Sequence, residues 1–144
     1  SFAWIGFATE TGSAQNPPRR PSHQTALDDI AAREAQLRRV NRQIWEFAEV
    51  GLEEKQSSAL LVEQLRQRGF EVQVGLASMP TAFVATFGSG KPVIGILAEY
   101  DALPSLSQKV SPTRDPVEDG KPGHGCGHCG LGTGSIGAAL AVKA

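Results

Sequence analysis

The segment His124-Gly125-Cys126-Gly127-His128-Cys129-Gly130 holds both cysteines and two of the three histidines of the chain. Thiolate and imidazole groups are the usual protein ligands for zinc and similar ions. Cys126 and His128 are two positions apart, so in an extended segment their side chains point to the same face. The glycines beside them let the backbone pass close to a bound ion. The segment therefore predicts half of a metal site.

A carboxylate follows a predicted buried strand upstream of this segment. Residues 93–98 are apolar on both faces, which favours a central strand covered from both sides. Glu99 and Asp101 come directly after it, where open α/β sheets place their sites. An isolated Asp is more typical of a loop cap, so Asp101 becomes a candidate only together with the Cys/His segment.

The remaining pattern predicts an α/β fold. Apolar residues spaced in threes, fours and sevens predict an amphipathic helix from a capping box at Thr25 and Asp28 to Gly51. A second helix is expected from about Glu54 to Gly69, and a third, rich in small residues, from Ser135. The predicted strands are residues 70–74, 81–87 and 93–98, with a hairpin turn at residues 88–91 between the last two.

The domain organisation expected from the sequence is a tail followed by one incomplete domain. Residues 1–24 are predicted to be a disordered tail or the remnant of a signal peptide, and residues 25–144 the N-terminal portion of a catalytic domain. We expect a cytoplasmic protein, or a periplasmic or secreted one if residues 1–14 derive from a signal peptide.

Composition excludes several classes of partner. The chain has 14 basic and 15 acidic residues among its 144, and no apolar run approaches the roughly 20 residues of a membrane-spanning helix. We therefore expect neither a nucleic-acid nor a membrane partner. Two cysteines three positions apart cannot form the disulfide framework of a small secreted domain, so we interpret them as metal ligands or as a redox pair.

Alternative interpretations of the cysteines remain open. Cys126-Gly127-His128-Cys129 matches the redox motif of protein disulfide isomerases, although no strand ending in aromatic residues leads into it. A closed zinc site built from His124 and the three donors after it is sterically hard, because four donors from six residues cannot easily surround one ion. A thiol–disulfide oxidoreductase and a non-catalytic metal-binding remnant are the two alternatives to a hydrolase.

Four segments together resemble the M20 family of metallopeptidases and amidohydrolases, in particular the aminobenzoyl-glutamate hydrolase type within it. The resemblance covers the chain from about Asp28 to Ala144. The four segments are Ile44–Glu54 (IWEFAEVGLEE), Gly69–Val72 (GFEV), Ala98–Pro104 (AEYDALP) and Gly123–His128 (GHGCGH).

The resemblance implies roles for individual residues. Cys126 and His128 would be metal ligands, with Cys126 bridging two ions, and Asp101 would be the carboxylate that orients and supports the site. Glu99 stands where the peptidase branches have His and this branch has an acid, and both Glu99 and His124 are expected to lie behind the ligands. Cys129 stands where the family usually has Asp or Asn, so its support of His128 is not expected to follow the family pattern.

The chemistry implied by the resemblance is hydrolysis of the amide bond of a small N-acyl amino acid. Two divalent ions, zinc or manganese, would polarise the carbonyl and activate a water molecule, and a glutamate would act as general base. The general base, the further ligands and a dimerising second domain of the family have no counterpart up to Ala144. We therefore expect the chain to be part of a longer homo-oligomeric enzyme, to be inactive alone and to expose sheet edges that aggregate.

Overall fold

The computed structural model describes residues 20–144. The prediction of a signal-peptide remnant at residues 1–14 lies outside the described residues, and the compartment stays a prediction. In the part of the chain that the structure describes, no helix is long and apolar enough to cross a membrane.

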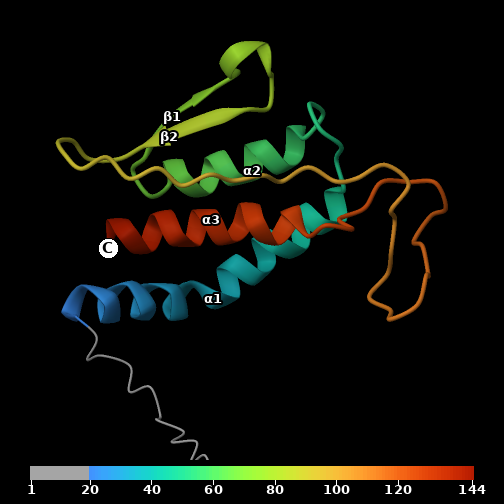
Figure 1. Cartoon of the computed structure of the whole chain (residues 1–144), viewed down its shortest axis with the longest axis horizontal. Coiled ribbons are helices and arrows are strands. Elements are labelled where there is room, and N and C mark those ends of the chain that lie inside the picture. The colour runs from blue at the N-terminus through green and yellow to red at the C-terminus, as the bar shows by residue number, and fades with distance from the viewer. Residues whose placement is uncertain (1–19) are drawn as a thin grey trace, which may run out of the picture.

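Three α-helices and one two-stranded sheet make up the fold (Figure 1). Helix α1, Pro21–Phe47, lies beside the C-terminal helix α3, His128–Lys143, and helix α2, Lys55–Arg66, lies between these helices and the sheet. Strands β1, Glu71–Val74, and β2, Phe83–Thr86, pair antiparallel, and the short 3₁₀ helix η1, Leu76–Ser78, joins them. The predicted α/β class is confirmed.

The core forms where the three helices meet. Ile44 of α1 and Leu61 of α2 are fully buried and lie at its centre. Aliphatic side chains of this kind supply most of the stability, at roughly 25 cal/mol for each Å² of apolar surface removed from water. The other buried members of the cluster are Val40, Leu65, Cys129, Ile136 and Leu140.

Glycines on α3 permit close helix packing, as its small-residue pattern predicts. A Cβ atom added at Gly137 would lie 3.2 Å from Leu37 Cδ1, and one added at Gly132 would lie 3.0 Å from Tyr100 Cβ. At this distance a methyl group would press on its neighbour, which would have to shift by a few tenths of an ångström. The Gly132–Gly137 pattern is therefore a packing feature of the helix.

The helix starts differ from the predicted ones. Helix α1 begins at Pro21 rather than Thr25, because the fixed φ of proline suits the first helical position, so the predicted tail is helical from Pro21 onward. The expected capping box does not form: the Thr25 hydroxyl donates to the Pro21 carbonyl, and the Asp28 carboxylate accepts from Gln24. Helix α3 begins at His128 rather than Ser135.

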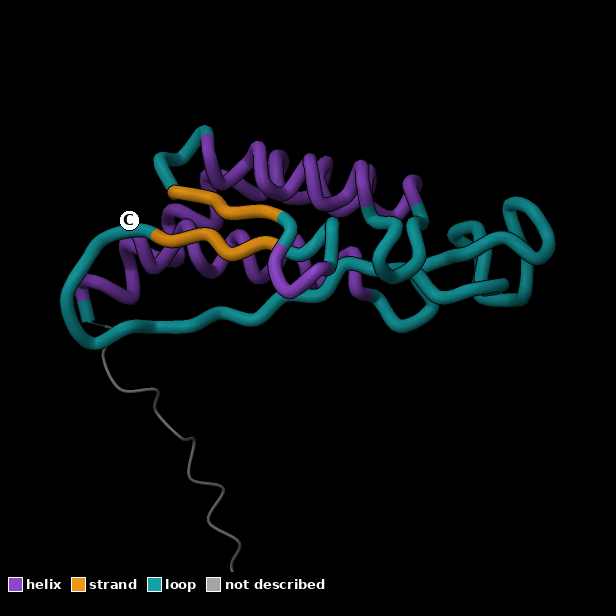
Figure 2. Tube along the Cα trace, turned by 90° about the horizontal axis from the view of Figure 1, so that it is seen from above, coloured by secondary structure: helices purple, strands orange, loops and turns teal. Residues whose placement is uncertain are grey.

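The third predicted strand is wrong. Residues 93–98 pair with no strand among residues 20–144, so the hairpin predicted at residues 88–91 does not form and β2 pairs with β1 alone. The connection after β2 runs back along the molecule as a long loop (Figure 2). A segment that is apolar on both faces needs partners on both sides to be buried. Because this segment pairs with no strand of the described chain, Val93 and Leu97 are 86% and 84% exposed.

Glu49 anchors the start of α2 from the connection that precedes it. Its carboxylate accepts the backbone N–H groups of Gln56 and Ser57 at 2.9 and 2.8 Å, and the Ser57 hydroxyl at 2.8 Å. Burial alone would raise the pKa of Glu49, but these hydrogen bonds outweigh it and hold the pKa below its usual value.

We predict that Glu49→Gln lowers the free energy of unfolding by about 1–2 kcal/mol at neutral pH, because the amide accepts these hydrogen bonds more weakly than a carboxylate. A carboxyl group whose pKa is lower in the folded state stabilises the fold above its unfolded pKa, about 4.3, and that contribution is lost as the pH falls through the folded value. Urea denaturation at several pH values should therefore show that the free energies of unfolding of the variant and the original chain become equal at acid pH. A constant difference across this range would contradict the prediction.

We also predict that Val93→Thr leaves the free energy of unfolding within about 0.5 kcal/mol of the original and raises solubility, because this side chain is already in water. The matched control is Val62→Thr, since Val62 is 4% exposed in α2. Burying a hydroxyl there should cost about 1–3 kcal/mol. Equal losses in the two variants would show that Val93 is covered in solution. Denaturation and light scattering measure both effects.

Candidate metal and catalytic site

The Cys/His segment turns into a helix at its centre. Gly127 adopts a left-handed conformation, with φ of 83°, and His128 is the first residue of α3. Glycine reaches this conformation without steric cost, which explains its place between the two candidate ligands. The expectation that Cys126 and His128 share one face of an extended segment is therefore wrong. Cys126 lies in the turn before the helix and is exposed.

His128 and the two predicted carboxylates do come together. The Nδ1 atom of His128 donates to Asp101 Oδ1 at 2.7 Å, and its Nε2 atom lies 3.0 Å from Glu99 Oε2. The imidazole is only 23% exposed, so these contacts are partly shielded from water. One ring is held between two carboxylates that sequence reasoning places on the same segment.

His124 is hydrogen-bonded to the backbone of α1 rather than to the carboxylates. Its Nε2 atom donates to the Ile44 carbonyl at 3.0 Å, and its buried Nδ1 atom has no hydrogen-bond partner among the described residues. Burial lowers the pKa of His124, because the charged imidazolium would lose its hydration. The arrangement holds the segment against the end of α1 through a neutral ring.

Cys129 packs into the hydrophobic core. It is 7% exposed, belongs to the buried cluster and has a pKa raised by burial. Both cysteines are free thiols. A buried thiol of this kind behaves as a small apolar side chain. The oxidoreductase alternative for Cys126 and Cys129 stays a prediction.

Backbone contacts that sequence reasoning missed hold Asp101 in place. The Ala102 N–H donates to the Glu49 carbonyl at 2.7 Å, and Leu103 pairs with Gly123 in a two-way backbone bridge. The Tyr100 hydroxyl donates to the Thr81 carbonyl at 2.6 Å. The only signal in the sequence was the position of Glu49 within the segment that resembles the M20 helix region.

The donor atoms fit a metal ion in part. A metal-binding histidine usually gives its second ring N–H to a carboxylate, which is the relation between His128 and Asp101. The other ring nitrogen faces Glu99, so an ion could replace that contact and take both atoms as ligands. Among residues 20–144, however, no group of three His, Cys, Asp or Glu side chains is arranged to hold an ion.

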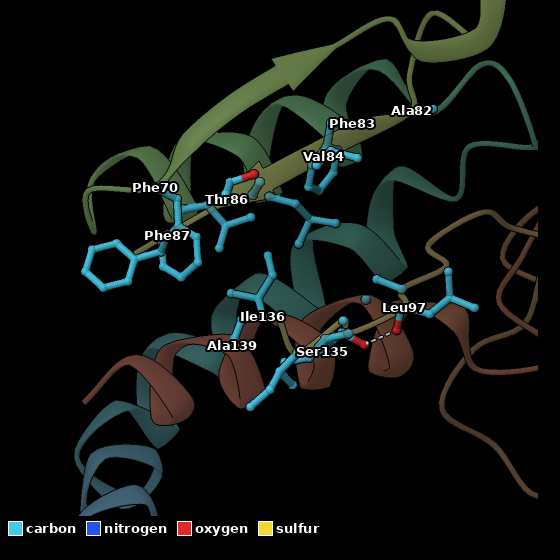
Figure 3. A pocket seen from close by; sticks show the side chains of 18 of the residues that line it. Phe70, Ala82, Phe83, Val84, Thr86, Phe87, Leu97, Ser135, Ile136 and Ala139 are labelled. Atoms are coloured by element: carbon cyan, nitrogen blue, oxygen red, sulfur yellow. Dashed lines mark hydrogen bonds between the residues drawn. The ribbon is translucent and has the colours of Figure 1, made fainter. Parts of the chain in front are cut away.

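An apolar groove of about 900 Å³ lies beside these carboxylates. Figure 3 shows β2 on one side of it and α3, with Ile136 and Ala139, on the other. The Ser135 hydroxyl donates to the Leu97 carbonyl at 2.9 Å and ties the unpaired segment to α3. Glu99, Tyr100 and Asp101 line the same groove.

Comparison of the sequence with known proteins finds similarity to hydrolases and peptidases. No protein-family model matches the chain. It is 44% identical over 119 residues, 81% of this chain and 24% of the relative, to one of the subunits of the p-aminobenzoyl-glutamate hydrolase of Escherichia coli (strain K12). It is 31% identical over 103 residues, 70% of this chain and 25% of the relative, to thermostable carboxypeptidase 1 of Saccharolobus solfataricus. It is also 27% identical over 117 residues, 81% of this chain and 29% of the relative, to hippurate hydrolase of Campylobacter jejuni.

The chain spans about a quarter of the length of these curated relatives.

We predict that Gly132→Ala lowers the free energy of unfolding by about 1–3 kcal/mol, because the new methyl group would press on Tyr100 Cβ at 3.0 Å and the Glu99 carbonyl at 3.1 Å. Gly134→Ala is the matched control on the same helix, since nothing lies within 4 Å of a Cβ atom there. That variant should be neutral or gain up to about 1 kcal/mol from helix propensity. Chemical denaturation measures both, and equal effects would refute close packing at Gly132.

Proposed function

Because this chain is a partial match to the M20-type amidohydrolases, we propose that it forms part of the catalytic region of a metal-dependent amidohydrolase. The observation that carries the proposal is the His128 ring, with Asp101 on Nδ1 and Glu99 at Nε2. Hydrolysis is supported by the relatives, each of which is named as a hydrolase or a peptidase.

The site residues have distinct proposed roles. His128 and Cys126 would hold divalent ions, and the position of Glu99 at Nε2 supports it as a further ligand. Asp101 would fix the orientation of the His128 ring and make its free nitrogen a better ligand. His124 would hold the segment against α1, and Cys129 would pack behind it. When bound, zinc or manganese supplies Lewis acidity toward an amide carbonyl and a water molecule.

The substrate class proposed is a small N-acyl amino acid. Two of the relatives are named for hydrolysis of p-aminobenzoyl-glutamate and of hippurate. We propose that the described residues supply only some of the donors, and that the general base and the remaining ligands belong to a longer homo-oligomeric protein. The relative from Escherichia coli is itself named as a subunit.

We predict that the chain binds zinc or manganese and that His128→Gln abolishes binding measured by isothermal titration calorimetry. Asp101→Asn should weaken binding about 10–100-fold, because an amide supports the ligand ring less well than a carboxylate. The control is His23→Gln, since His23 is exposed near the start of α1. Binding that survives His128→Gln unchanged would refute the proposed ligand.

In a longer protein, release of p-aminobenzoate from p-aminobenzoyl-glutamate should require Cys126, and full activity of Cys126→Ser would count against the proposal.

A further inference from the structure

The α1–α2 connection contacts both α2 and the segment that carries Asp101. From one side, the Glu49 carboxylate accepts backbone N–H groups of Gln56 and Ser57 in the first turn of α2. From the other, the Glu49 carbonyl accepts the N–H of Ala102 at 2.7 Å. A single residue therefore fastens two segments about 50 positions apart.

The second of these contacts lies next to the candidate site. Ala102 is 2% exposed, pairs with Val50 in a parallel bridge and directly follows Asp101. The Asp101 carboxylate in turn accepts the His128 Nδ1–H at 2.7 Å. The contacts form a continuous path from the start of α2, through Glu49 and Ala102, to the ring of His128.

The connection needs an anchor to keep its shape. Ala48 and Leu52 have φ angles of 46° and 68°, a left-handed region that costs a non-glycine residue roughly 1 kcal/mol or more. Glu54, at the N-cap of α2, makes no side-chain cap hydrogen bond. The charge-assisted hydrogen bonds of Glu49 fix the start of α2 to this connection, together with backbone hydrogen bonds such as that from Glu53 to the Val50 carbonyl.

We infer that Glu49 is a positioning residue, which holds the Ala102 backbone so that Asp101 stays against the His128 ring. The inference rests on the proposed function only for the metal-binding readout described below. It assigns Glu49 an effect on the site beyond its effect on helix stability, and these two effects can be separated by experiment.

The test compares Glu49→Gln with Asp29→Asn in the full chain. Asp29 is a matched control because it also accepts charge-assisted hydrogen bonds, at 2.6 and 2.7 Å from Arg33 of α1, and makes no contact with the site. Both variants lose a carboxylate whose pKa lies below its usual value: hydrogen bonds from Arg33 lower that of Asp29. Glu49→Asp serves as a second variant if Glu49→Gln fails to fold.

Two measurements follow on the folded variants. The ring nitrogen resonances of His128, assigned by comparison with His128→Gln, report whether Nδ1–H remains bound to Asp101 at neutral pH. Titration calorimetry with Zn²⁺ reports the affinity of the site. We expect Glu49→Gln to shift the Nδ1 resonance and to weaken Zn²⁺ binding about tenfold, the lower range for groups that support a metal ligand. Asp29→Asn should change neither.

The outcomes separate this inference from the proposed function. An unchanged Nδ1 resonance in folded Glu49→Gln overturns the positioning role, and so does an equal shift in Asp29→Asn. If the original chain binds no Zn²⁺, the metal proposal fails, and the resonance comparison still decides the role of Glu49. Restoration of the original resonance in Glu49→Asp, together with its loss in Glu49→Gln, supports positioning by the carboxylate.

Discussion

The close approach of α3 to its neighbours is the constraint on which the rest of the structure depends. Gly132 brings the helix within contact of the Glu99 and Tyr100 backbone region, and Gly137 brings it against Leu37 of α1. Because His128 is the first residue of the same helix, the packing of its glycines also sets the position of the imidazole. The distance between His128 and the two carboxylates thus depends on helix packing as well as on the backbone contacts that hold Asp101.

The residues that meet in the candidate site could be chosen from the sequence because their chemistry is local. Asp101, His128 and Glu99 were each indicated by type and by nearness to a predicted strand end or to the Cys/His segment. Their geometry was not accessible in this way. The extended arrangement of Cys126 and His128 failed because Gly127 starts a helix there, and a single glycine is consistent with either a loop or a helix start.

The secondary-structure elements also differ in how well the sequence alone predicts them. Helices α1 and α2 and strands β1 and β2 follow from periodicity, since each packs one face against a partner inside the described chain. The segment 93–98 has an equally strong local pattern, but a strand is defined by its neighbours, and none pairs with it among residues 20–144. The role of Glu49 was not predicted for a related reason: its contacts are hydrogen bonds to backbone groups of the α2 start and of Ala102, which no periodic pattern indicates.

The hydrogen bond from His124 to the Ile44 carbonyl joins residues 80 positions apart. Contacts of such separation form slowly, because the chain must lose the entropy of closing a long loop before they stabilise anything. The helical hairpin of α1 and α2 can form from near neighbours, whereas Asp101 and His128 meet only after α3 has docked on it. The candidate site therefore depends on contacts between segments far apart in the sequence, and Cys126 has its native surroundings only once these contacts have formed.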